Sequence, residues 1–167
     1  MKKPNSIVRS AIGQSVHRFV PPDTAKPCII GGIIFDNMPG FQATSDGDVV
    51  FYALCNAIST LTHVSIIGGY ADELLAKEGI TDSSVFLKEA AKTLKHQKIT
   101  HISLSLEAQR PLLKEAIPQM RKKIAQVLKI SEDLVGITAI SADALTECGC
   151  GNGVSCLAVI TTQEDIQ

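Results

Sequence analysis

The chain has 167 residues, of which 45% are hydrophobic and 20% are charged, with sixteen Lys and Arg against seventeen Asp and Glu. This usage is that of one ordinary globular domain, which we expect to span residues 1–167. The formal charge of −1 gives no broad positive field to hold a nucleic acid or an anionic membrane. The most apolar stretches, Cys28–Phe35 and Val154–Ile160, are far shorter than the roughly 20 residues of a membrane-spanning helix. Nucleic acids and membranes are therefore not expected as partners.

The five cysteines are scattered, with no spacing typical of a disulfide framework or of a zinc knuckle. Near the start of the chain, Ile7–Ile12 is interrupted by Arg9 and Ser10, so it does not form the apolar core of a signal peptide. Both features favour a reducing compartment, and we predict a cytoplasmic protein.

The first half of the chain predicts two strands and a helix. A strand is expected over Ser10–Phe19, and a β-branched strand runs from Ile30 to Phe35 before the turn residues 36–40. Apolar residues then recur at helical spacing between Asp48 and Leu61, behind cap-type residues. The segment from Asp48 to Leu61 is therefore predicted to be a helix.

A second helix is predicted from Ser83 to His96, with Asp82 as its N-cap. Between His101 and Leu106, apolar and polar residues alternate with the period of a half-buried strand. One face of the sheet should therefore be polar or form an interface.

The last third predicts one helix and two strands. Pro118 suits the first turn of a helix over Gln119–Leu128, whose basic run Arg121–Lys123 is expected to face solvent. Strands are expected at Leu134–Ser141 and Val154–Thr161. Because strands and helices alternate along the chain, the fold class is α/β.

Several positions are candidates for chemistry, each with a structural alternative. Ser15 and His17 lie two apart on a predicted strand and so share a face, although a lone His is more often structural than a ligand. Residues 44–48, Thr-Ser-Asp-Gly-Asp, open a helix, where they suit an anion, a cation or simple capping. The alternating glycines of residues 149–153 allow close backbone approach, but they lack the lysine of a P-loop.

Five motifs together resemble one known family. Ser-Val-His-Arg-Phe at 15–19, Ile-Gly-Gly at 30–32, Thr-Ser-Asp-Gly-Asp-Val at 44–49, Ile-Pro-Gln-Met-Arg at 117–121 and Gly-x-Gly-x-Gly at 149–153 occur in the order and at the spacings of the 2-C-methyl-D-erythritol 2,4-cyclodiphosphate synthase family. The resemblance covers the chain from about Ser10 to Thr161. As a set the motifs are specific, although each alone is weak.

The resemblance implies a single domain with a mixed sheet packed by helices on one face. It also implies a homotrimer whose sheets face the threefold axis, with active sites at the subunit boundaries. In this family the 2-phosphate of a cytidine-diphospho-methylerythritol phosphate attacks the β-phosphorus and CMP leaves. The reaction is that of a phosphorus–oxygen lyase in isoprene biosynthesis by the non-mevalonate pathway. Zinc and a second divalent ion, Mg or Mn, orient and neutralise the diphosphate.

The resemblance places the zinc ligands at Ser15, His17 and Tyr52, where the family has Asp, His and His. Only His17 retains a family ligand. A serine hydroxyl and a phenol with an ordinary pKa near 10 are poor zinc ligands beside carboxylate and imidazole. We therefore do not expect tight zinc binding at this position.

The phosphate-binding positions also differ from the family. By resemblance, Thr44, Ser45, Asp46, Gly47 and Ala142 bind substrate, and Thr44 replaces a His of the family. The family's Thr-Thr-Thr-Glu stretch matches residues 140–143, which assigns the catalytic positions to Ser141 and Asp143. Ser141 keeps a hydroxyl and Asp143 keeps a shortened carboxylate, whereas Ala142 retains neither group.

Three hypotheses follow. The chain is a synthase with a rebuilt metal site, using His17 with Asp46, Asp48 or Cys55. Alternatively, it is a noncatalytic homotrimeric pseudoenzyme with a degenerate metal site, which binds a ligand or regulates a partner. A remoter hypothesis is a different hydrolase or lyase in the same cleft. The sequence alone leaves open whether the chain is an enzyme.

Overall fold

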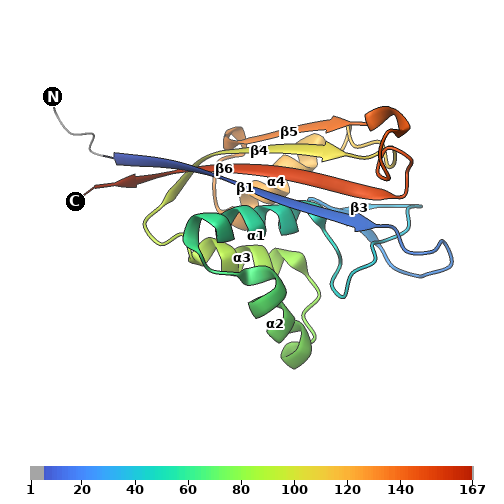
Figure 1. The fold of residues 1–167 in the computed structure, drawn as a ribbon, viewed down its shortest axis with the longest axis horizontal. Helices are drawn as coiled ribbons and strands as arrows, with labels where there is room; N and C mark the ends of the chain where they lie inside the picture. Colours follow the sequence, from blue (N-terminus) through green and yellow to red (C-terminus); the bar gives the residue numbers. More distant parts are fainter. Residues whose placement is uncertain (1–5, 167) are drawn as a thin grey trace.

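The computed structural model describes residues 6–166. Figure 1 shows the arrangement of the elements. In chain order they are β1 (Ser6–Arg18), β2 (Cys28–Ile30), β3 (Ile33–Phe35), α1 (Val49–Thr62), the π-helical turn η1 (Ile66–Tyr70), α2 (Ala71–Glu78), α3 (Ser83–Lys92), β4 (Lys98–Glu107), α4 (Ile117–Leu128), the 3₁₀ turn η2 (Glu132–Leu134), β5 (Val135–Ile140), the 3₁₀ turn η3 (Ala142–Ala144) and β6 (Gly153–Asp165).

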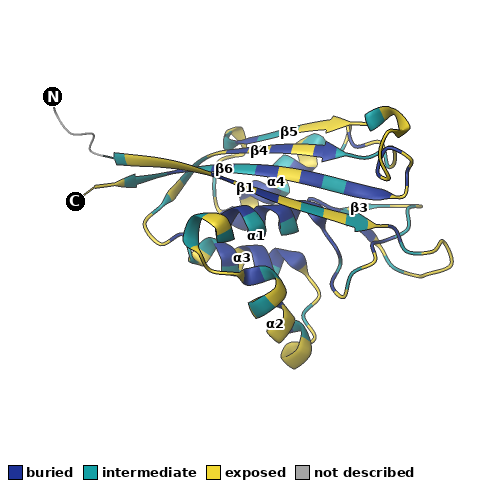
Figure 2. Cartoon of the chain, in the orientation of Figure 1, coloured by how far each residue is buried: buried dark blue, intermediate teal, exposed yellow. Residues whose placement is uncertain are grey.

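The main sheet has the strand order β1-β6-β4-β5. Strand β6 runs antiparallel to both β1 and β4, whereas β5 runs parallel to β4. Helices α1 and α4 pack on one face, and α3 packs against these two helices (Figure 1). Within residues 6–166 no helix covers the other face, and from Ala11 to Arg18 exposed residues alternate with buried or half-buried ones along β1 (Figure 2). The predicted α/β class, with a mixed sheet and helices on one face, is confirmed.

Helix α1 lies unusually close to β1 at Gly13. A Cβ atom added to Gly13 would lie 2.2 Å from the carbonyl oxygen of Ala53 and 2.3 Å from the nitrogen of Ala57. Any side chain at Gly13 would therefore push the helix off the strand. This contact fixes the start of α1 beside the end of β1, where His17 lies on the same face of the strand as Gly13.

The carboxylate of Asp48 joins the start of α1 to the turn between β2 and β3. Its Oδ1 accepts hydrogen bonds from the backbone N–H groups of Gly31 (2.9 Å), Val50 (3.0 Å) and Phe51 (3.2 Å), and its Oδ2 accepts one from Gly32 (2.6 Å). Asp48 is 0% exposed. Burial raises its pKa to about 7, and the amides of Gly32, Gly31 and Phe51 oppose that rise. Asp48 is thus the N-cap of α1 and also an anchor for a second element.

The single strand predicted from Ile30 to Phe35 is wrong in one respect. Gly31 and Gly32 adopt φ values of 60° and 74°, so the chain reverses between them and β2 pairs with β3 as a hairpin. Side-chain-bearing residues rarely adopt such angles, whereas glycine does so readily. The two glycines indicate this turn, but the β-branched residues on either side of them favour one continuous strand.

Two helical predictions also differ from the structure. The helix predicted from Ser83 to His96 ends at Lys92, because Thr93 caps it and the chain then turns toward β4. Segments η1 and α2 were not predicted at all. Gly68 and Gly69 interrupt that region and disfavour a helix locally. The other predicted elements are confirmed with ends shifted by a few residues.

No single helix within residues 6–166 is long and apolar enough to cross a membrane. Helix α1 and the η1–α2 segment reach the necessary length and composition only as a pair, which is bent by 90°.

The anchoring role of Asp48 predicts a large loss of stability on truncation. Asp48→Ala leaves four N–H groups without their acceptor, three of them in buried hydrogen bonds, so the free energy of unfolding should fall by at least about 3 kcal/mol. Urea unfolding at one fixed protein concentration measures this loss. Asp23→Ala, at an exposed position, is the control and should change stability by under about 0.5 kcal/mol. A loss below about 1 kcal/mol for Asp48→Ala would contradict the anchoring role.

Candidate functional site

His17 and Tyr52 meet where β1 lies against the start of α1. Their ring centroids are 5.3 Å apart and the ring planes are nearly perpendicular, at 86°. Ser15 and His17 share one face of β1, as the two-residue period of a strand predicts. Burial lowers the pKa of His17, and the charge of Lys26 adds to this effect, so the imidazole is neutral at pH 7. Its Nε2 is buried and has no hydrogen-bond partner in the described part of the chain.

The hydroxyl of Tyr52 is hydrogen-bonded to the hydroxyl of Ser45. The two side-chain oxygens are 2.8 Å apart, and the Ser45 oxygen also accepts a hydrogen bond from the Gly47 N–H at 3.1 Å. Ser45 is buried, and burial raises the pKa of the Tyr52 phenol, which keeps its proton at neutral pH. The pair is therefore a neutral, internally satisfied unit next to His17.

Asp46 connects the start of α1 to the start of α3. Its Oδ2 accepts the Ser83 N–H at 2.9 Å, its Oδ1 accepts the Asp48 N–H at 3.1 Å, and the Ser83 hydroxyl donates to the same carboxylate. Gly47 follows with φ 75°, and a Cβ atom there would lie 2.7 Å from Cβ of Phe41. These contacts hold the Thr44–Asp46 segment in one conformation.

Ser141 and Asp143 lie at the end of β5, where the Ser141 hydroxyl donates to Asp143 Oδ1 at 2.8 Å. Ala142 lies between them, and Ala142, Asp143 and Ala144 all have positive φ values, of 55°, 45° and 62°. Ser141 and Asp143 line a shallow pocket with Cys150. Thr44, Ser45 and Asp46 line a different pocket, of about 490 Å³. A single chain does not bring the two predicted groups together.

The residues at the predicted zinc position do not fit a zinc ion. Zinc sites in proteins draw on thiolate, imidazole and carboxylate ligands. Here His17 offers one imidazole, Ser15 offers a neutral hydroxyl, and the Tyr52 phenol is protonated and bonded to Ser45. In residues 6–166 no group of three or more His, Cys, Asp or Glu side chains is placed to hold a metal ion.

The other side chains proposed for a rebuilt metal site, Asp46, Asp48 and Cys55, are also buried or hydrogen-bonded to other groups. The thiol of Cys55 is fully buried, and burial raises its pKa, so it does not supply a thiolate. The carboxylate of Asp48 is surrounded by backbone amides, and that of Asp46 by Ser83 and a backbone amide. The hypothesis of a zinc site rebuilt from these side chains is not supported.

A second divalent ion is a different case. Mg²⁺ typically binds proteins through one or two carboxylates together with phosphate oxygens of the substrate. The carboxylate of Asp143 lines the pocket at the end of β5 and is accessible there. Asp143 therefore fits an ion of this kind when a substrate contributes further ligands.

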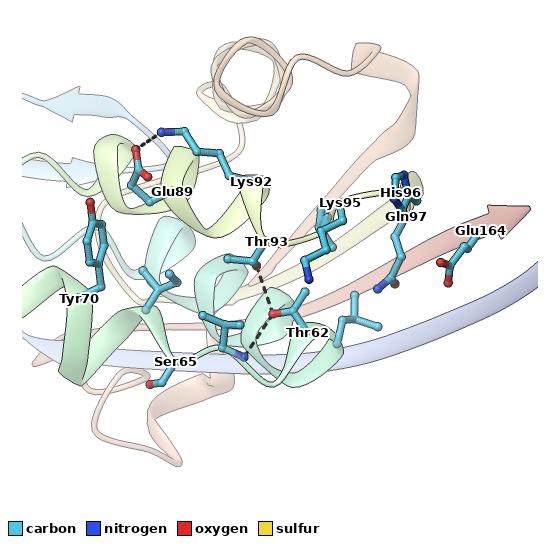
Figure 3. Close-up of a pocket in the computed structure, with 14 residues that line it drawn as sticks. Thr62, Ser65, Tyr70, Glu89, Lys92, Thr93, Lys95, His96, Gln97 and Glu164 are labelled. Atoms are coloured by element: carbon cyan, nitrogen blue, oxygen red, sulfur yellow. Dashed lines mark hydrogen bonds and ion pairs between the residues drawn. The ribbon is translucent and has the colours of Figure 1, made fainter.

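Another pocket, of about 630 Å³, lies at the far end of α1 and contains none of the residues predicted from the sequence (Figure 3). Thr93 donates to Thr62 across it at 3.1 Å, and Lys92 pairs with Glu89 at 2.5 Å. Lys92 and Lys95 lie at the C-terminal end of α3, where positive charge stabilises the helix dipole. The positive charges at this pocket are therefore explained by their place at the end of α3.

Lys26 and Lys123 line the pocket of Thr44–Asp46, and neither was a predicted site residue. The sequence predicts that Lys123 and Arg121 both face solvent. Arg121 instead donates to the carbonyl oxygens of Val135 and Glu132, at 2.8 Å and 2.9 Å. No local sequence pattern indicates either lysine, since their proximity to Thr44 depends on the β2–β3 hairpin.

Comparison with known proteins identifies the class of this α/β chain. Residues 8–163 match the YgbB family. The protein named 2-C-methyl-D-erythritol 2,4-cyclodiphosphate synthase in Chlamydia muridarum is 56% identical over 162 residues, covering 96% of this chain and 91% of that protein. Its namesake in Chlamydia felis is 51% identical over 165 residues, covering 98% and 94%.

Solved structures agree on the fold. The bifunctional IspDF from Campylobacter jejuni superposes with a TM-score of 0.85 at 25% identity, over 96% of this chain and 43% of that longer chain. The CDP complex of IspF from Plasmodium falciparum gives 0.79 at 22% identity, over 95% and 97%. The chain belongs to the YgbB family. The resemblance found in the sequence motifs is thus confirmed.

If only the ligands were lost and the scaffold is intact, restoring them should restore zinc binding. We expect Ser15→Asp combined with Tyr52→His to bind about one zinc per chain, because a carboxylate and a second imidazole join His17. Competition calorimetry against a chelator measures the affinity. Tyr52→Phe, which removes the hydroxyl without adding a ligand, is the control and should gain nothing. A double variant that folds but binds no zinc would show that more than the ligands has changed.

Proposed function

We propose that this chain is a cyclodiphosphate synthase, which converts a cytidine-diphospho-methylerythritol 2-phosphate to a cyclic diphosphate and CMP. The observation that carries the proposal is the 56% identity, over 96% of the chain, to a relative of that name. The reaction belongs to isoprenoid precursor biosynthesis by the non-mevalonate pathway. The proposal includes a single domain over residues 1–167 and a cytoplasmic location.

The proposal also includes a homotrimer assembled through the uncovered sheet face. Ile12 and Val16 on β1 are 56% and 60% exposed, and Leu157 on β6 is 38% exposed. The β1–β6 register places Leu157 opposite Gln14, which lies between these two residues, so the three side chains form one apolar group on the sheet. Apolar groups of this kind commonly mark protein interfaces. A trimer with sheets facing its axis would cover them.

A subunit boundary also offers a way to complete the site. The Thr44–Asp46 segment and the Ser141–Asp143 segment line separate pockets of one chain. A substrate with a methylerythritol phosphate at one end and a cytidine at the other needs contacts at both ends. An assembly in which the Thr44–Asp46 segment of one copy lies beside the Ser141–Asp143 segment of another would supply the contacts at both ends.

In this reaction an oxygen of the 2-phosphate attacks the β-phosphorus, the new P–O bond closes the ring, and the bond to the CMP oxygen breaks. Phosphoryl transfer of this kind depends mainly on positioning and charge stabilisation. The Thr44 hydroxyl donates to a phosphate oxygen, and Asp46 keeps the Thr44–Asp46 segment rigid through Ser83. The Ser141 hydroxyl would turn from Asp143 to a phosphate oxygen when Asp143 holds an ion. Asp143 would hold a divalent ion, which neutralises phosphate charge when it is bound. Zinc at His17 is not part of the proposal.

A second candidate function is a noncatalytic trimer that binds ligand or regulates a partner. The specific observation in its favour is the neutral Tyr52–Ser45 pair beside His17, which occupies the predicted zinc position. Such a chain would retain the fold of the family and lack turnover.

The synthase proposal predicts CMP release. The purified chain, incubated with the cytidine-diphospho substrate and Mg²⁺, should form CMP and the cyclic diphosphate in equal amounts, measured by chromatography and phosphorus NMR. Asp143→Asn should lower the rate at least about tenfold, because the charge that holds the ion is lost. Asp133→Asn, at an exposed position in η2, is the matched control. If the wild type forms no CMP while Ser15→Asp with Tyr52→His does, the chain is the noncatalytic trimer.

The assembly proposal predicts a mass of three chains of 17.8 kDa in solution. Light scattering after gel filtration measures it. Leu157→Lys should dissociate the assembly, since it places a charge within the apolar group of the sheet. Lys98→Leu, at the exposed end of β4, is a control that should keep the mass. A monomeric wild-type chain would contradict the proposed trimer.

A further inference from the structure

We propose that the hollow between the β2–β3 turn, α4 and the Thr44–Asp46 segment binds a phosphorylated small organic molecule, with Lys123 as its principal cation. The hollow has a volume of about 490 Å³ and is lined by residues from four separate parts of the chain. None of the residue roles implied by the family resemblance involves Lys123 or the β2–β3 turn.

The side chain of Lys123 is held in place along most of its length. A Cβ atom added to Gly32 would lie 2.5 Å from Cγ of Lys123, 3.1 Å from its Cε and 3.0 Å from Cζ of Phe51. The aliphatic stem of Lys123 therefore crosses the glycine turn, next to the Phe51 ring. Because the stem is already packed, ordering the ammonium group around a ligand costs less entropy than for a free surface lysine.

The charge of Lys123 is not matched within residues 6–166, where its ammonium forms no ion pair and no hydrogen bond. The carboxylates of Asp46 and Asp82 line the same hollow. Both are engaged in helix capping: Asp46 accepts from Ser83, and Asp82 accepts the Ser84 N–H at 2.7 Å. Both carboxylates therefore accept backbone N–H groups at the start of α3, where the positive end of the helix dipole offsets part of their charge.

Lys26 supplies a second positive charge to the lining of the hollow. Its Nζ donates to the carbonyl oxygens of Phe41 at 2.8 Å and Ala43 at 2.6 Å, which fixes the ammonium and leaves one N–H for a ligand. Thr44, Thr81 and Ser84 contribute side-chain hydroxyls that have no hydrogen bond among the described residues. Ammonium and hydroxyl donors converging on one hollow suit the oxygens of a phosphate group.

The remaining wall is apolar, which favours an organic phosphate over inorganic phosphate. Ile29, Ile34 and Phe51 line the hollow, and Ile34 is 62% exposed. A carbon skeleton against these side chains would remove apolar surface from water while its phosphate meets the lysines. The neighbouring Lys122 is exposed and does not line the hollow. Its substitution therefore shows how much an exposed lysine of the same helix contributes to ligand binding.

Thr44, Ser45 and Asp46 line this hollow and also belong to the proposed substrate site, but the inference does not depend on turnover. It is tested by equilibrium binding, whereas the proposed function is tested by CMP release. A chain that releases no CMP can still bind an organic phosphate through Lys123, and an active chain can fail to do so.

The probe is phenyl phosphate, with inorganic phosphate for comparison, measured by titration calorimetry at one ionic strength. We expect phenyl phosphate to bind more tightly than inorganic phosphate. Lys123→Met, which retains the apolar stem over Gly32, should weaken phenyl phosphate binding about tenfold. Lys123→Arg should retain affinity within about threefold, and Lys122→Met should bind like the wild type.

Two results would overturn the inference. One is equal affinity of the wild type and Lys123→Met for phenyl phosphate, which would place any binding elsewhere on the chain. The other is no detectable binding of phenyl phosphate by the folded wild type. Circular dichroism and the solution mass of each variant establish that it is folded and assembled like the wild type.

Discussion

The arrangement of the candidate site depends on one buried carboxylate. Asp48 accepts hydrogen bonds from amides at the start of α1 and from the two glycines of the β2–β3 turn, and it is 0% exposed. Through this residue the turn is attached to the helix that carries Tyr52 and follows Ser45. A buried carboxylate is costly unless it is fully hydrogen-bonded, so the geometry around it is closely specified. The hollow with Lys123 and the Tyr52–Ser45 pair both adjoin this anchor.

The residues that build the scaffold suit their structural roles, whereas those at the predicted zinc position do not suit a metal. Gly13, Gly47 and Asp48 are required by close contacts or by buried hydrogen bonds, and each keeps the residue type that the fold needs. At the predicted zinc position, by contrast, a phenol and a serine hydroxyl stand beside His17. The phenol is satisfied by Ser45, so the replacement fills the site without leaving an unpaired hydroxyl. Nε2 of His17 is buried beside this pair without a hydrogen-bond partner among the described residues.

Much of the fold could be predicted from the sequence, because it rests on periodicity and on local capping. The helix at Asp48–Leu61 and the strand at His101–Leu106 follow from apolar spacing alone. The β2–β3 hairpin was missed because its turn depends on two positive φ values rather than on a hydrophobic pattern. The site was predicted only in part for a related reason. The assignment of Tyr52 to a ligand position is a prediction from the sequence resemblance, whereas its bond to Ser45 and the packing of Lys123 on Gly32 are tertiary contacts.

The central claim is that this member of the YgbB family keeps the scaffold without a zinc ion at His17. The most direct test is the metal content of the purified, tag-free wild-type chain, measured by elemental analysis after exposure to excess zinc and gel filtration. The account predicts zinc far below one ion per chain. A stoichiometry close to one zinc per chain, lost in His17→Ala, would contradict it.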